Sequence, residues 1–554
     1  MKIFKPYTPG QKMLLPPDLE EMIPVGHRVR VVNAVVDRMD LKTLEAQFKG
    51  GGATAYHPRM MVKVLVYAYM EGVCTSRKIA KALRENIHFM WLSGMQRPDF
   101  RTVALFRRGR LKEEIKTVFA GVVHVAEEMG LVDGTTVFVD GTKMGANANR
   151  HRIVWRKTVA KRQERLEEQI EARWQEIEAL EAEEEGKYGK RDLPETGEGQ
   201  DLREQEVKIE EAVARVNARL KKQAEAREAK ERKAWERKKR KLDKELRTLQ
   251  EKKAKTVADQ EALGKRSGMS ATDPGAGPMM FKGEGFKPGY TVMIATQNQI
   301  ILGYQVTQQT NDGTCFIPLM EELKGIQGKA PERVGGDSAF GNEENYVYCE
   351  EEGMEAYLKY GMFHHEGTKA HREDRYHKNH FVYDPEQDSY RCPEEQILSF
   401  DHGEERVTAT GYKQTSRVYR GQACGVCAQK LECCKGQART ITRNENWERL
   451  RTAARKRLRS AAGKQMRKRR GVEVETAFGD MKHNDGWRRF LLRGLPKTTI
   501  EAGLHGMAHN LKKIAIHLLK TLYSNPFLKP TKLLLRDKEL QGTFYSNQDR
   551  FSFI

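Results

Sequence analysis

The sequence predicts an α/β fold, in which a mixed sheet is flanked by helices, interrupted by two insertions and preceded by an N-terminal helical domain. Three observations predict it. Short apolar runs end in an acid at Asp140 and again at Asp337. A long charged segment, residues 157–266, separates these runs and repeats apolar residues at helical spacing. Five of the eight cysteines then crowd between Cys392 and Cys434.

The composition indicates a polyanionic partner. The chain has 554 residues, a formal net charge of +21 and a pI of about 9.4, which favours nucleic acid. No apolar run approaches the roughly 20 residues needed to span a bilayer. The N-terminal MKIFKPYTPGQ also lacks the apolar core of a signal peptide. We therefore expect a cytoplasmic, nucleoid-associated protein with no membrane partner and no disulfide scaffold.

Residues 1–130 are expected to be mainly helical. The apolar run 60–70 follows Pro58, and capping residues open segments 75–83 and 99–114. Short helices joined by turns resemble a DNA-binding helical unit. The alternative is an ordinary helical domain with a solvated basic face. The candidate DNA contacts of the last segment are Arg101, Arg107 and Arg108.

Strand patterns lie on both sides of the charged segment. Residues 135–140 predict a strand that Gly141 ends, 291–295 and 300–306 predict a hairpin, and 333–337 and 355–360 predict two more strands. Residues 316–323 predict a helix. Asp140 and Asp337 thus each end a strand of one sheet, where a carboxylate is held rigidly and left open to a metal ion. A lone strand-end Asp more commonly caps the next turn.

Two insertions interrupt this pattern. The charged segment 157–266 predicts an antiparallel coiled-coil hairpin, either a DNA contact or a solvated charged rod. Residues 361–440 are expected to be loop-rich, and their CxxC pair with two further cysteines predicts a structural zinc site. Cys434 or a histidine is the substitute ligand, and reduced, unliganded thiols are the alternative. The predicted zinc ligands are Cys392, Cys424, Cys427 and Cys433.

The C-terminal part carries the third acid. Glu475 and Lys482 are seven residues apart, about two helical turns, so they share one helix face. Glu473 is nine residues from Lys482 and points to the opposite side. A carboxylate can hold a divalent metal and a nearby lysine can hold a phosphate. The alternative is an exposed charged helix. We expect helix over 447–470 and 471–522, then a partly ordered tail.

The three acids together suit phosphodiester chemistry. Cleavage and strand transfer need two divalent cations about 4 Å apart, one to activate the nucleophile and one to stabilise the leaving oxygen. Magnesium prefers hard oxygen ligands and needs few carboxylates. Asp140, Asp337 and Glu475 would provide such a site.

Several motifs resemble those of DDE transposases of prokaryotic insertion sequences, whose catalytic domain has the RNase H-like fold. The resemblance implies that Asp140 and Asp337 are the two catalytic aspartates, and that Glu475 with Lys482 completes the pattern. The family also places a Tyr and an Arg upstream of that Glu; this chain offers Arg469 or Arg470 and no Tyr. The motifs are VDGTKMGANANRHRIVW (139–155), TDPGAGPM (272–279), TNDGTCFIPLM (310–320), GGDSAFGNEENY (335–346), the cysteine cluster (392–434), VETAFGDMKHNDGWRRFLLRG (474–494) and AHNLKK (508–513).

The resemblance further implies two Mg²⁺ or Mn²⁺ ions as cofactors and double-stranded DNA, both inverted-repeat ends and target, as partner. It implies a homodimer or higher oligomer whose N-terminal helical domain binds the ends. Asp273 and Asp312 lie in the motifs and either support the site or cap loops. The DNA-binding residues expected near the third acid are Lys482, Arg488, Arg489 and Arg493.

The resulting hypothesis is a transposase that cleaves and joins DNA at the ends of a mobile element. The alternatives are a non-catalytic or domesticated DNA-binding relative, and a nuclease without strand transfer. The expected domains are 1–130 (helical, DNA-binding), 131–156 and 267–360 (RNase H-like, first and second parts), 157–266 (coiled coil), 361–440 (Cys/His-rich), 441–522 (RNase H-like, C-terminal helices) and 523–554 (tail).

Overall fold

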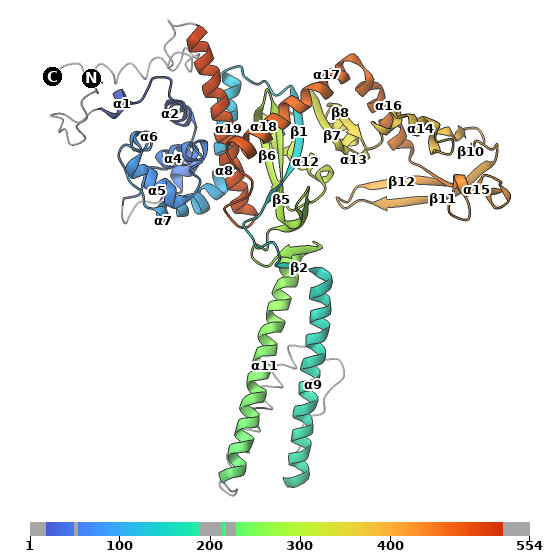
Figure 1. Ribbon diagram of the computed structural model, residues 1–554, viewed down its shortest axis with the longest axis horizontal. Coiled ribbons are helices and arrows are strands. Elements are labelled where there is room, and N and C mark those ends of the chain that lie inside the picture. The colour runs from blue at the N-terminus through green and yellow to red at the C-terminus, as the bar shows by residue number, and fades with distance from the viewer. Residues whose placement is uncertain (1–17, 49–53, 189–212, 214, 216–228, 525–554) are drawn as a thin grey trace, which may run out of the picture. The chain divides into compact units, whose positions relative to one another are not determined.

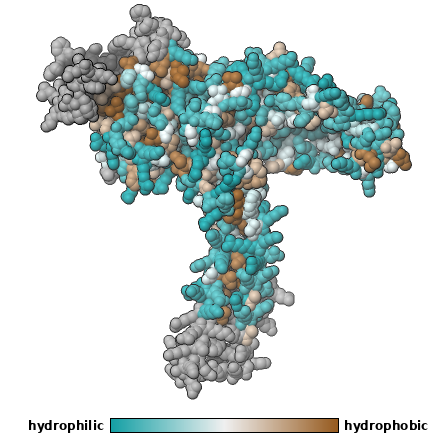
Figure 2. Space-filling model, in the orientation of Figure 1, coloured by the Kyte–Doolittle hydropathy of each residue, from teal (hydrophilic) through white to brown (hydrophobic). Residues whose placement is uncertain are grey.

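The computed structural model describes residues 18–48, 54–188, 213, 215 and 229–524 (Figure 1). The chain divides into two compact units, residues 1–148 with 275–554, and residues 149–274. Hydrophilic residues cover most of the face shown in Figure 2. Among the described residues, we find no helix with the length and apolar character that crossing a bilayer requires.

The first unit contains, in its described part, a six-stranded mixed sheet of order β4-β5-β1-β7-β8, with β6 paired to β5. β1 pairs in parallel with β7, and β7 with β8, whereas the other pairings are antiparallel. This mixed α/β architecture confirms the predicted fold class at that level. The strands are β1 (Thr136–Gly145), β4 (Gly277–Phe281), β5 (Gly285–Gln297), β6 (Ile300–Thr307), β7 (Arg333–Gly341) and β8 (Glu355–Tyr360).

The predicted hairpin and most predicted strands are confirmed. β5 and β6 are joined by Asn298 and Gln299, both with positive φ, as a two-residue hairpin turn of type I′ requires. The strand ends are not where the sequence placed them. β1 continues through Gly141 to Gly145 because it stays paired with β5 along that whole stretch. Asp140 therefore lies inside a strand, and so does Asp337 within β7.

Helices pack around this sheet and build one large hydrophobic core with it. α19 contacts β6, α8 and α4, while α16 and α17 contact β8 (Figure 1). The predicted helix at 316–323 is confirmed. The helical elements around the sheet are η3 (Asp312–Cys315), α12 (Phe316–Gln327), α13 (Glu343–Glu351), α16 (Glu445–Arg459), α17 (Ala461–Arg470), η7 (Gly471–Glu475), α18 (Thr476–Gly479), η8 (Asp480–Asn484) and α19 (Leu495–Ser524).

The N-terminal region is mainly helical in its described part, as predicted. α4 is almost completely buried, which explains its unbroken apolar sequence. The predicted helix 99–114 is instead interrupted by the π-helical segment η1, so its arginines do not follow α-helical spacing. The elements are α1 (Leu19–Met22), α2 (Arg28–Arg38), α3 (Lys42–Ala46), α4 (Pro58–Met70), α5 (Ser76–Glu85), α6 (Ile87–Leu92), α7 (Phe100–Leu105), η1 (Phe106–Arg110) and α8 (Leu111–Glu128).

Residues 361–440 were expected to be loop-rich, but they contain an antiparallel sheet of order β13-β12-β11-β10-β9. Its core is small: Phe381, Tyr390, Leu398, Tyr419 and Ile441. β11 and β12 are mostly exposed, so they lack the alternating apolar pattern that reveals strands. The elements are η4 (His365–Gly367), α14 (Lys369–Glu373), η5 (Lys378–His380), β9 (Val382–Asp384), β10 (Ser389–Arg391), β11 (Ile397–Val407), β12 (Lys413–Gly421), η6 (Cys424–Val426), α15 (Lys430–Cys433) and β13 (Thr440–Arg443).

The second unit is built on a helical hairpin. α9 (Arg156–Tyr188) and α11 (Ala229–Leu263) run side by side in opposite directions and extend from the short strand pair β2 (Ile153–Trp155) and β3 (Gly268–Ser270) (Figure 1). Arg173 on one arm lies 3.2 Å from Glu245 on the other. Val159, Leu263 and Met269 form a small core at its base. Much of the predicted seam, including Ile209, Val216 and Leu220, lies outside the described residues, as does the predicted tail beyond 524.

Candidate active site

The two predicted aspartates lie where the parallel strands β1 and β7 separate. The last paired rung of these strands joins Phe138 to Gly335. Asp140 and Asp337 each follow two residues later, so both side chains occupy the point where the ladder opens. β7 also loses its pairing with β8 between Gly336 and Gly341. The sequence analysis expected a strand end to leave the carboxylate of Asp337 accessible to a metal ion. In the structure, the interrupted pairing of β7 provides that space instead.

Glu475 ends the π-helical segment η7 that follows α17. π-helical turns bond i to i+5 and commonly occur at functional sites. Arg470 and Glu475, five residues apart, therefore share one face. The two candidate glutamates, Glu473 and Glu475, differ in how far their side chains are exposed to solvent. Glu475 has a side chain that is 68% exposed, whereas that of Glu473 is 7% exposed.

Glu473 has a structural environment. One carboxylate oxygen accepts the backbone N–H of Gln299 at 2.7 Å, and the other accepts from Arg469 at 2.9 Å. The sequence argument preferred Glu475 because it shares a helix face with Lys482. The intervening π-helical segments alter that spacing, but burial and pairing of Glu473 lead to the same preference.

Arg470 brings the three predicted acids together. Its guanidinium lies 2.9 Å from Asp140 Oδ2, 3.9 Å from Asp337 Oδ2 and 3.7 Å from Glu475 Oε1. The Arg470 side chain is only 14% exposed, so its charge is poorly screened. Sequence reasoning left Arg469 and Arg470 undecided, because the family pattern has a Tyr as well as an Arg upstream of the Glu, and this chain offers two arginines and no Tyr.

The pKa values of two carboxylates at the site, Asp140 and Asp312, are raised. Burial raises the pKa of Asp140 to about 6, against the favourable charge of Arg470. Burial also raises the pKa of Asp312, with the neighbouring charge of Asp337 adding to the effect. Asp312 in turn contributes to the raised pKa of Asp140. The sequence analysis left Asp312 open between supporting the site and capping a loop, and in the structure its charge acts on Asp140 while Asp337 acts on it.

Two lysines border the carboxylates. Lys482 donates to Thr142 Oγ1 on β1, and its pKa is lowered by burial despite the opposing charge of Asp140. The pKa of Lys359 on β8 is lowered first by burial and then by Arg470, while Asp337 opposes the shift. Lys359 was not singled out by the sequence analysis, because nothing in its strand pattern distinguishes it.

The candidate DNA-binding arginines fall into three classes. Arg101, Arg108 and Arg488 are exposed. Arg489 and Arg493 are also exposed but donate to Asn147, on the Oδ1 and backbone oxygen respectively. Arg107 requires a correction. It is 5% exposed, and its guanidinium donates to Tyr69, Cys74 and Ser76, so it holds the helices together and does not face DNA.

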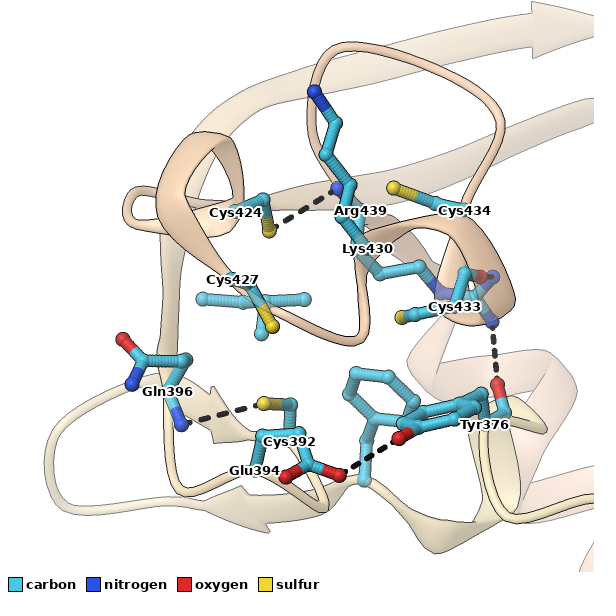
Figure 3. A pocket seen from close by; sticks show the side chains of 12 residues that line it. Tyr376, Cys392, Glu394, Gln396, Cys424, Cys427, Lys430, Cys433, Cys434 and Arg439 are labelled. Atoms are coloured by element: carbon cyan, nitrogen blue, oxygen red, sulfur yellow. Dashed lines mark hydrogen bonds between the residues drawn. The ribbon is translucent and has the colours of Figure 1, made fainter.

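The four predicted zinc ligands line one pocket, together with Cys434 (Figure 3). Cys424 Sγ accepts the Arg439 backbone N–H at 3.4 Å, and Cys392 Sγ accepts that of Gln396 at 3.2 Å. Burial raises the pKa of Cys433, and neighbouring thiols add to the shift. No histidine is among the described residues that line this pocket.

Two family models match parts of the chain. One, described as a transposase DDE domain, matches residues 391–515. The other, described as a transposase domain (DUF772), matches residues 17–109. The two matches indicate an insertion-sequence DDE transposase. Comparison of the chain with curated proteins and with solved structures finds no match.

The matched ranges of the transposase cover part of the site. Glu475, Lys482 and the cysteine cluster lie within the DDE match, and Arg101 lies within the other. Asp140 and Asp337 lie outside both. Their assignment to the site therefore depends on the sequence motifs and on their meeting at Arg470.

DDE transposases generally use divalent metal ions, and the donor chemistry of this site suits them. Three carboxylates and the nearby Asp312 present hard oxygen atoms, and one oxygen of Asp312 is buried without a hydrogen-bond partner among the described residues. Within the described part of the chain, however, no three His, Cys, Asp or Glu side chains are close enough together to surround one ion. Arg470 instead provides the positive charge between the acids.

Proposed function

We propose that this transposase cleaves DNA at the inverted-repeat ends of a mobile element and joins those ends to target DNA. The observation that carries the proposal is the meeting of Asp140, Asp337 and Glu475 around one guanidinium. These residues come from two strands and a helix that are far apart along the chain.

Asp140, Asp337 and Glu475 would hold two Mg²⁺ or Mn²⁺ ions. When bound, such ions activate the attacking water or 3′-hydroxyl and stabilise the leaving oxygen. Asp140 fixes one side of the site, since its strand stays paired with β5 at Ile294, while Asp337 lies where the pairing of β7 is interrupted. Glu475 is exposed and can adjust its side chain as the substrate enters.

The basic residues have a complementary role. Arg470 and a metal ion compete for the same carboxylate oxygens, so we expect Arg470 to turn toward the DNA phosphate when ions bind. Lys482 lies beside Asp140 and is placed to hold a phosphate next to the cleaved bond. Both residues would offset charge that develops during phosphoryl transfer.

The strand order supports an RNase H-like catalytic domain. The series β6-β5-β1 is antiparallel and β1-β7-β8 is parallel, so the first strand of the sheet is central and carries the first acid. We propose the domain boundaries of the sequence analysis for this enzyme, with the helical hairpin and the Cys-rich sheet as insertions.

Double-stranded DNA is the proposed partner, bound as a homodimer or higher oligomer. The net charge of +21 favours binding to phosphate. The proposed DNA contacts are the exposed Arg101, Arg108 and Arg488. Two further arginines, Arg489 and Arg493, donate hydrogen bonds to Asn147 and would support DNA binding by holding their segment in place.

We also propose a structural zinc ion in the Cys-rich sheet. Thiolates are the preferred structural ligands of zinc, and the shared pocket of Cys392, Cys424, Cys427 and Cys433 supports this assignment. The hydrophobic core of that sheet is small, so a bound zinc ion would add to the stability of the sheet.

The deciding experiment uses a labelled duplex that carries the element's own end. Asp140→Asn, Asp337→Asn and Glu475→Gln should each abolish cleavage in Mg²⁺ while retaining DNA binding in a gel-shift assay. Wild-type protein that binds the ends but never cuts them would favour the non-catalytic alternative. Cutting without joining of the ends would favour the nuclease.

A further inference from the structure

A fourth carboxylate lies beside the three predicted acids. Asp312 begins the 3₁₀ turn η3, directly after β6, and Asn311 caps that turn by accepting the Gly313 N–H at 3.1 Å. Asp312 is 172 residues from Asp140 along the chain, but the fold brings the two carboxylates close enough to interact electrostatically. This placement is not explained by the capping role, because Asn311 performs it.

Gly141 creates the space that Asp312 occupies. A methyl group at Gly141 would lie 2.6 Å from Met293 Sδ, 3.0 Å from Asp312 Cγ and 3.1 Å from Asp312 Oδ2, so Met293 and Asp312 share this space. The carboxylate therefore packs against the backbone of the residue that follows Asp140. The Gly141 N–H donates to Asp140 Oδ1 at 2.9 Å, so both aspartates adjoin the same residue.

The turn that carries Asp312 is fixed on the other side by β7. A methyl group at Gly313 would lie 2.5 Å from the carbonyl oxygen of Ala339, two residues beyond Asp337. The Asn345 side chain donates to Gly313 O at 3.0 Å. Asp312 is thus held between the strand of Asp140 and the strand of Asp337.

The Asp312 carboxylate is not satisfied by the protein. Its Oδ1 is buried and has no hydrogen-bond partner within the described residues. Burying a polar oxygen without a partner is unfavourable, so such an atom is expected to have a ligand in the working enzyme. Burial and the charge of Asp337 raise the pKa of Asp312, the charge of Lys143 opposes that shift, and Asp312 in turn raises the pKa of Asp140.

We infer that Asp312 is a fourth oxygen ligand of the divalent-metal centre, shared with Asp140 and Asp337. This inference rests on the proposed function. It explains why a carboxylate with an unpartnered oxygen is held against the backbone beside Asp140. It also supplies an oxygen from a rigid turn, which the exposed Glu475 does not.

The test measures metal binding without DNA. Free Mn²⁺ is titrated by electron paramagnetic resonance against the full chain and against Asp312→Asn, Asp140→Asn and Glu321→Gln. Glu321 is a matched control, because it loses the same charge on the adjoining helix α12 and is exposed, where it accepts from Tyr348 at 2.7 Å. We expect Asp312→Asn to weaken Mn²⁺ binding by about tenfold or more. Glu321→Gln should bind as wild type does.

A second readout guards against misfolding. Without metal, Asp312→Asn should melt at or above the wild-type temperature, because it removes a poorly compensated charge. Added Mn²⁺ should then raise the melting temperature of the variant less than that of wild type.

The outcomes separate the two proposals. Wild-type affinity for Mn²⁺ in a folded Asp312→Asn, alongside weakened binding by Asp140→Asn, would overturn the role of Asp312 alone. Absence of Mn²⁺ binding by the wild-type protein, or wild-type binding by Asp140→Asn, would overturn the proposed metal centre itself. Loss of folding in metal-free Asp312→Asn would show a structural carboxylate and also overturn the inference.

Discussion

Glu473 and Glu475 are two residues apart, and the structure predicts opposite consequences of removing each. Glu473→Ala deletes the acceptor of the part-buried Gln299 N–H. Leaving such a donor unpaired costs about 1–3 kcal/mol. The lost ion pair adds little, because Arg469 is 41% exposed and regains water. The free energy of unfolding should therefore fall by about 1–3 kcal/mol, with cleavage retained in the folded fraction.

Glu475→Ala should do the reverse. The side chain is 68% exposed and its ion pair with Arg470 spans 3.7 Å, so its removal should change the free energy of unfolding by less than about 1 kcal/mol. Cleavage of the end duplex should disappear. Urea unfolding followed by circular dichroism gives the stability of both variants, and single-turnover cleavage gives their activity. A stable, inactive Glu473→Ala beside an active Glu475→Ala would refute the choice of Glu475.

Three further predictions follow from particular side chains. At limiting Mg²⁺, cleavage should be about tenfold slower at pH 5 than at pH 7. Burial raises the pKa of Asp140 to about 6, and this carboxyl group must lose its proton to bind a cation. A cleavage rate that stays constant between pH 5 and pH 7 would contradict this role of Asp140. Arg101→Ala should reduce the slope of log affinity against log salt by about 1, whereas Arg107→Ala should leave the slope unchanged and lower the melting temperature; equal slopes for both variants would remove Arg101 from the interface. Elemental analysis should find one zinc ion per chain in the wild-type protein and none in Cys392→Ser. Purified wild-type protein that contains no zinc would show that the cysteines of the pocket are reduced, unliganded thiols.

The sequence predicted the central strands because their residues are buried on both faces and so read as continuous apolar runs. Val137, Phe138 and Val139 are fully buried, and the run ends visibly at Asp140. The sequence could not show that β1 continues beyond it. The polar stretch after Asp140 stays in the sheet only because β5 is long enough to pair with it.

The predicted acids were reachable from sequence, but the residue that joins them was not. Asp140, Asp337 and Glu475 stand in recognisable motifs. Arg470 faces Glu475 only because η7 is π-helical, and a sequence pattern based on 3.6 residues per turn cannot reveal that. The sequence could not decide the role of Asp312 for another reason. Its approach to the site depends on Gly141 lacking a side chain, which is a property of tertiary packing.

The Cys-rich sheet was missed because its strands are held by backbone pairing and by a few aromatic residues, with most side chains in water. Phe400 on β11 is 46% exposed and Val407 is 60% exposed. Strands of this kind bury only a few residues, here Leu398 on β11 and Val418 and Tyr419 on β12, so most of their sequence resembles a polar loop.

The central claim is that Asp140, Asp337 and Glu475 belong to one metal centre. Iron(II) bound in place of Mg²⁺, with ascorbate and peroxide, generates hydroxyl radicals that cut the backbone within a short distance of the ion. Mass spectrometry of the fragments should find cuts near residues 140, 337 and 475 in the same sample, all lost in Asp337→Asn. Cuts near only one of these positions, or cuts that persist in that variant, would contradict the account.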